Sequence, residues 1–108
     1  MTDETFNLIV TQVISALNIP KKDIFISKKK RPLVDARHMI YYCCYHFGIR
    51  NTYIKEYFWR RDYRVPHASI IHGVNRMTIQ RRTDQDLRRL QDKIIDACTK
   101  QMNYGHKH

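Results

Sequence analysis

The sequence predicts a single all-α domain of five or six helices. Apolar residues recur along most of the chain at the i, i+3, i+4 spacing of amphipathic helices. No segment alternates polar and apolar residues for long enough to predict a strand, and no repeat or low-complexity linker interrupts the chain. Its 108 residues are the length of one domain. We therefore expect one compact domain over residues 1–102 and a flexible tail over residues 103–108.

The first part of the chain predicts a long helix, a single turn and a basic loop. Residues 6–17 carry the apolar spacing of an amphipathic helix, and Asn18 and Pro20 are of the types that end one. The stretch PKKDIF then predicts one helical turn that returns two apolar side chains to the core. The stretch that follows, SKKKR, predicts a surface loop.

The next segment, from about residue 33 to residue 47, predicts the central helix of the domain. Pro32 suits the first turn of a helix, and Gly48 suits the position just after the last turn. The apolar stripe between them is broad and includes Met39, Cys43 and Phe47. A stripe of this width predicts a helix that is nearly buried.

The second half of the chain predicts three more helices. Residues 51–59 predict a short helix, and the arginine-rich stretch up to Pro66 predicts a turn. The helix over residues 67–81 is expected to be anchored by three apolar side chains, Ile70, Ile71 and Val74. A last amphipathic helix opens near Thr83.

Residues 52–81 thus have the order of a helix-turn-helix. In that motif the second helix lies in the major groove of DNA, and its first residues meet base edges. Two consecutive helices also occur in any helical bundle, so the pattern needs a second observation beside it.

Charge is that second observation. Lys and Arg total 20 against 10 acidic residues, a formal net charge of +10. Such an excess predicts a polyanion, a membrane surface or an acidic protein as the partner, and at this density we favour nucleic acid. The cations that precede the candidate recognition helix form three groups: Lys28, Lys29, Lys30 and Arg31; Arg37; and Arg60, Arg61 and Arg64. A solvated surface is the alternative interpretation of each group taken alone.

Three stretches, SKKKRPLVDARHM, IKEYF and RRDYRVPHASIIHGVNR, resemble the C-terminal DNA-binding domain, domain IV, of the bacterial replication initiator DnaA. The resemblance covers about residues 6–80. It implies a Trp-repressor-like helix-turn-helix fold with double-stranded DNA as the partner. The base contacts that it implies fall on His67, Ala68 and Ser69. It also implies a minor-groove contact from the basic loop and a phosphate contact from Arg37.

The chain departs from that family in ways that bear on function. Pro66 stands where the family has an aspartate that can accept a bond from cytosine, and Ala68 replaces a threonine. The turn is longer and richer in arginine. We expect Arg60 and Arg61 to contact phosphates from it, and Arg64 is the alternative base reader. No GxxxxGK[ST] motif occurs, so we expect no ATPase activity.

These observations predict a sequence-specific binder of double-stranded DNA in the cytoplasm, acting in replication control or transcription regulation at sites similar to those of DnaA. An origin in a phage or mobile element is one interpretation of the missing ATPase segment. The alternative function is an interaction module for the host initiator or another acidic protein, since Pro66 and Ala68 weaken the expected base contacts. We expect a monomer, with a homodimer as the alternative.

Other classes are disfavoured by residue type. Three cysteines without CxxC spacing predict neither a disulfide framework nor a zinc module, and indicate a reducing compartment. His67 and His72 point in different directions on one helix, so we expect no metal site. A nuclease with His67 as base is disfavoured because Asp62 is the one carboxylate nearby. We expect no enzyme activity, cofactor, small-molecule substrate or membrane segment.

Overall fold

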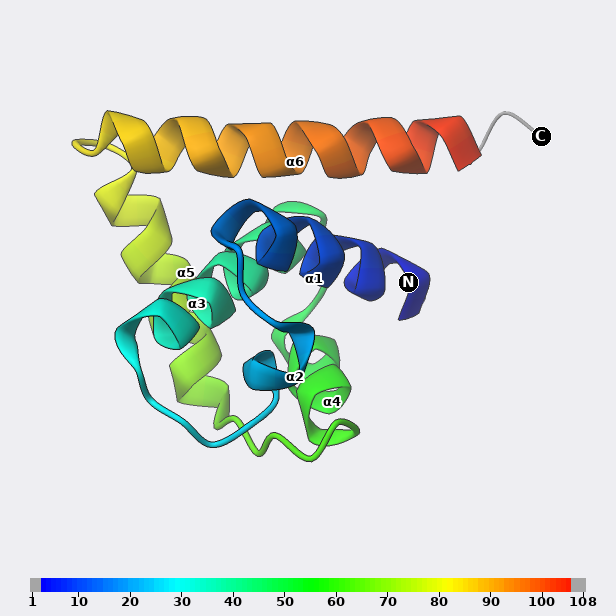
Figure 1. Ribbon diagram of the computed structural model, residues 1–108, viewed down its shortest axis with the longest axis vertical. Helices are drawn as coiled ribbons and strands as arrows, with labels where there is room; N and C mark the ends of the chain where they lie inside the picture. Colours follow the sequence, from blue (N-terminus) through cyan, green and yellow to red (C-terminus); the bar gives the residue numbers. More distant parts are fainter. Residues whose placement is uncertain (1–2, 106–108) are drawn as a thin grey trace.

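The structure, a computed structural model, describes residues 3–105. Over that range it contains helices and no strands: α1 (Asp3–Leu17), α2 (Lys21–Ile24), α3 (Arg31–His46), α4 (Asn51–Trp59), α5 (His67–Gln80) and α6 (Gln85–Gly105). They form one compact body, so the predicted all-α, single-domain class is confirmed. Figure 1 shows α6 along one end of the body. The beginning of α5, the α2–α3 loop and the α4–α5 connection lie at the opposite end.

The core forms around α3, as the width of its apolar stripe predicts. α3 contacts every other described helix, and its Met39, Ile40 and Cys43 are almost completely buried. The end of the stripe differs from the prediction. Phe47 lies beyond the last helical residue, at the C-cap, and is only partly buried against the core.

Three helices end at a residue in the left-handed conformation. Asn18 follows α1 with a φ of 55°, and Gly48 follows α3 with a φ of 80°. The N–H groups of Gly48 and Ile49 donate to carbonyls of the last turn of α3, both at 3.0 Å. This pattern satisfies carbonyl groups that a helix end leaves unpaired. The predicted ends at Asn18 and Gly48 are confirmed, whereas a similar end after α4, with Asp62 at a φ of 63°, was not predicted.

One glycine lets α5 approach α3 closely. A Cβ atom at Gly73 would lie 2.8 Å from Cδ2 of both His38 and Tyr41 on α3. α5 buries Ile70 completely, but the predicted anchor Ile71 is 41 % exposed. Consecutive residues are rotated by about 100° around a helix, so Ile71 leaves the face that Ile70 shares with Gly73.

α6 begins close to the predicted position and ends later than predicted. Oδ1 of Asp84 accepts a hydrogen bond from the N–H of Leu87 at 2.9 Å, which is the geometry of an N-cap. The helix packs against α1 and α3 and continues to Gly105. Residues 103–105, expected in the flexible tail, are therefore helical, and residues 106–108 lie outside the described residues.

The three cysteines are buried and none forms a disulfide. Burial raises the pKa of Cys98 to about 11. The pKa values of Cys43 and Cys44 are raised further, because their apolar surroundings disfavour the thiolate. Burial therefore favours the protonated thiol, which is a poor nucleophile, at all three cysteines.

Candidate nucleic-acid interface

The first turn of α5 projects polar and small side chains away from the core. Its N-cap is Pro66, with a φ of −70° and a ψ of 150°. Val65, just before it, is 3 % exposed and anchors this point of the chain in the core. His67 and Ala68 are exposed, and Ser69 is half-buried. The predicted base readers thus lie on an accessible helix end, and the residue that precedes this end by two positions, Val65, is buried in the core.

The basic loop between α2 and α3 is shaped by a buried arginine. Arg37, on α3, is only 3 % exposed. Its guanidinium donates hydrogen bonds to four backbone carbonyls, those of Asp23, Ile24, Ile26 and Lys28. Its Cζ also lies 4.4 Å from the ring centroid of Tyr63, which belongs to the α4–α5 connection. Arg37 therefore joins the basic loop to that connection.

This position does not fit the phosphate contact expected of Arg37. The sequence places a cation close to a basic loop, but the convergence of four carbonyls on that cation depends on how α2 packs beside α3. Arg37 is a structural residue that holds the loop. The cations that the loop offers to solvent are the exposed Lys28, Lys29 and Lys30, followed by Arg31, which is 74 % exposed and lies 3.5 Å from Asp35.

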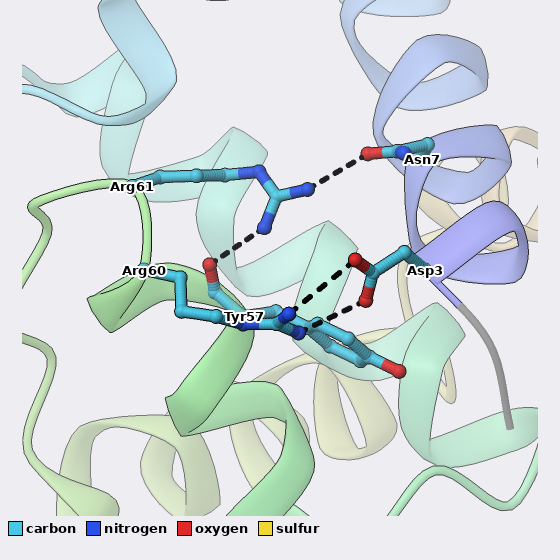
Figure 2. Close-up of polar contacts among 5 residues, drawn as sticks. All are labelled: Asp3, Asn7, Tyr57, Arg60 and Arg61. Carbon is cyan, nitrogen blue, oxygen red and sulfur yellow. Dashed lines mark hydrogen bonds and ion pairs between the residues drawn. The ribbon is translucent and has the colours of Figure 1, made fainter.

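Two arginines of the α4–α5 connection are engaged by α1 (Figure 2). Arg60 donates to both carboxylate oxygens of Asp3, at 2.9 and 3.4 Å. Arg61 donates to the carbonyl of Tyr57 at 2.8 Å and to Oδ1 of Asn7 at 3.0 Å. A phosphate contact from Arg60 requires it to leave Asp3, and an exposed pair of this kind contributes about 0–1 kcal/mol. Arg61 is a bridge between α1 and α4.

Arg64 is held differently, against an exposed tryptophan. Its Cζ lies 4.8 Å from the centroid of Trp59, and Nζ of Lys55 lies 4.5 Å from the same ring. Within residues 3–105, neither cation forms an ion pair with a carboxylate. Lys55 was not predicted. The signal that could have identified it is its spacing of four residues from Trp59, which places two helical side chains in contact.

A hollow of about 460 Å³ brings the predicted groups together. It lies between the basic loop, α3, the α4–α5 connection and the first turn of α5. Lys29, Arg64 and Ser69 line it, and Arg37 forms part of its wall, with Asp62 as the one carboxylate among them. Residues separated by about forty positions in the chain thus share one cationic depression beside the exposed His67.

A polar cluster behind this hollow was also not predicted. Nη1 of Arg76 lies 2.9 Å from Nδ1 of His38 and 2.8 Å from Oδ1 of Asp35. The ring of His72 meets that of His38 edge-on, with centroids 5.7 Å apart. Burial, together with Arg76 and His72, lowers the pKa of His38 to about 4. His38 is therefore neutral at pH 7, and its Nδ1 accepts from Arg76.

Other kinds of site are not evident in the part of the chain that the structure describes. Residues 3–105 contain no group of three or more His, Cys, Asp or Glu side chains placed to hold a metal ion. None of the helices in that range is both long enough and apolar enough to cross a membrane. Comparison of the chain with models of protein families, with curated proteins and with solved structures finds no match.

Proposed function

We propose that this chain binds double-stranded DNA through its α4–α5 unit, with the first turn of α5 in the major groove. The observation that carries the proposal is the cationic hollow. Lys29 of the loop, Arg64 of the connection and Ser69 of α5 line it together, beside the exposed His67 and Ala68. The major groove admits an α-helix, and phosphates on either side of the groove are then met by the cations that flank the helix.

Within DNA-binding proteins, the proposed type is a reader similar to domain IV of DnaA, acting in replication control or transcription regulation. His67 and Ser69 are the proposed base readers, and Ala68 contacts a thymine methyl group. The three loop lysines and Arg31 contact phosphates or enter the minor groove, whose negative potential attracts cations. This supports a duplex of defined sequence as the ligand.

The test is selection of bound sequences from a random duplex pool at a stated salt concentration, with the parent chain and four variants. We expect a defined consensus for the parent. His67→Ala and Ser69→Ala should relax preference at particular base pairs, at a cost of about 1–3 kcal/mol each on the preferred site. Lys93→Ala, on the exposed side of α6, is the matched control and should leave the consensus unchanged.

The variant Arg64→Ala separates two assignments of the base contact. If Arg64 contacts only phosphates, its removal weakens all sequences about equally. If it reads a guanine, the consensus changes in that variant and persists in His67→Ala. An absence of any duplex preference in the parent, together with capture by an acidic protein, would replace DNA binding by the interaction-module function.

A further inference from the structure

Trp59 is held at the surface by the chain segment that follows it. Its Nε1–H donates to the carbonyl of Val65 at 3.0 Å, and the connection between them turns back at Asp62, which has a φ of 63°. Val65 itself is buried. The indole is therefore fixed in orientation, yet it remains 39 % exposed. A rigid, accessible aromatic ring on a cationic surface is available to a ligand.

Two cations contact the indole of Trp59. Lys55 and Arg64 both approach its ring within 5 Å of the centroid. Together with Arg60 they line a second hollow, of about 360 Å³, in which Glu56 is the one carboxylate. Contact with the ring restricts the two long side chains in the unbound protein, which lowers the cost of ordering them when an anion binds.

The chemistry of this second hollow is converging positive charge held in place by an aromatic ring, because both cations lie over the indole. A phosphate is attracted by lysine and arginine, and a phosphate occurs in every nucleotide unit of a nucleic-acid backbone. Arg64 lines this hollow as well as the one beside α5, so the two hollows adjoin at this side chain.

We infer that Lys55, Trp59 and Arg64 form a second contact for the sugar–phosphate backbone of the duplex, next to the base-reading end of α5. The inference rests on the proposed function and extends it, since it adds a backbone site on the exposed face of α4. A duplex held by α5 presents its backbone to this hollow at high effective concentration. A free phosphate lacks that tether and should not occupy the hollow at millimolar concentration.

The chain contains one tryptophan and seven tyrosines, so emission excited at wavelengths that tyrosine does not absorb reports on Trp59 and this hollow alone. We would titrate the full chain with duplex of the selected sequence, the same sequence as a single strand, and inorganic phosphate. The duplex should change the Trp59 emission, with the dissociation constant that labelled DNA gives by anisotropy. Inorganic phosphate should leave the emission unchanged. A larger and tighter response to the single strand would overturn the assignment to duplex.

Salt dependence supplies the second readout. Affinity decreases with salt, and the magnitude of the slope of log affinity against log salt becomes smaller by about 0.9 for each phosphate of duplex DNA that the protein no longer neutralises. Lys55→Ala should reduce the slope by about that amount and leave the selected consensus unchanged. Lys93→Ala removes the same charge from α6 and should leave the slope unchanged.

The two proposals fail in different ways. If duplex binds with a consensus, but Trp59 emission stays constant and Lys55→Ala behaves as Lys93→Ala does, the second backbone contact is wrong and DNA binding stands. If no duplex binds at all, the proposed function fails and the second contact fails with it. Lys55 is partly exposed on α4 and forms no ion pair within residues 3–105, so the variant is expected to fold.

Discussion

At the scale of single residues, Arg37 and Arg61 differ in kind from Arg64. Arg37 and Arg61 donate to backbone carbonyls or to an amide oxygen and lie against aromatic rings. Arg64 lies over an indole, without a carboxylate partner in the described range. The first kind supports the fold, and the second is available to a ligand. Both kinds carry the same formal charge. Replacement of the first kind should lower the stability of the fold, whereas replacement of the second kind should weaken ligand binding.

Arg37→Ala should lower the free energy of unfolding by about 3 kcal/mol, because several carbonyls are deprived of a charged donor at a buried site. Denaturant unfolding measures this. Arg37→Lys should not restore stability, since one ammonium group cannot replace the planar fork of donors. A variant of unchanged stability that binds DNA more weakly would instead restore the phosphate contact expected from the sequence.

His38 should make stability depend on pH. Its pKa is about 4 in the folded protein, below the ordinary 6.5, so the unfolded chain binds the proton first as pH falls. The contribution of His38 to the free energy of unfolding is therefore fully present above pH 6.5 and is lost as the pH falls from 6.5 to 4. We expect a decrease of about 2 kcal/mol over this window, after allowance for solvent screening of a half-buried group.

The control for this pH dependence is His38→Gln, which keeps an oxygen that can accept from Arg76 but does not titrate. Urea unfolding at pH 5 and pH 7 should show a smaller difference in the variant than in the parent. Equal differences would assign the pH dependence to groups other than His38.

At the scale of elements, the α3–α5 crossing determines where the first turn of α5, which carries the proposed base contacts, lies. Gly73→Ala should destabilise the protein by about 1–3 kcal/mol, although alanine favours helix formation, because the new methyl group meets two rings at 2.8 Å. Thermal or denaturant unfolding measures this destabilisation.

Gly48→Ala is the matched control for the crossing. Nothing lies within 4 Å of a Cβ atom at Gly48, so its cost comes from the positive φ of 80° alone and should be about 1–2 kcal/mol. Gly73→Ala should in addition weaken binding to the selected duplex, because α5 must move away from α3. If Gly73→Ala is as stable as the parent, the two helices are not as close as described.

At the scale of the whole molecule, the proposed function depends on where the charge lies and not only on its sum. The exposed lysines of the basic loop lie at the end of the body that carries the start of α5, whereas α6 lies at the other end (Figure 1). Two double variants therefore remove the same charge from opposite ends of the molecule.

Lys29→Ala with Lys30→Ala should reduce the salt slope by about 1.8, because two phosphates are no longer neutralised, at about 0.9 each. Arg88→Ala with Lys93→Ala, on α6, should leave it close to the parent value. Measurements of duplex affinity at several salt concentrations distinguish the two. Equal effects from both pairs would indicate that net charge alone attracts DNA and that no defined face binds it.

The sequence alone was sufficient for the helices and for most of their ends. Amphipathic spacing and end-capping residues act between neighbours in the chain, so Asn18 and Gly48 could be assigned without knowledge of the packing. The exposure of His67 and Ala68 also followed from the face that Ile70 must bury. These are local properties, because one turn of helix is enough to determine them.

Only the tertiary structure decided which cations are free. Arg60 meets Asp3 across fifty-seven positions of the chain, Arg37 meets carbonyls that α2 brings to it, and Lys55 shares an indole with Arg64 through the fold of the connection. Long side chains of equal charge have no local signal that separates a structural role from an available one. Their role depends on which distant groups the packing of the helices places within hydrogen-bonding distance. A local sequence pattern does not determine the distance between residues that are far apart in the chain.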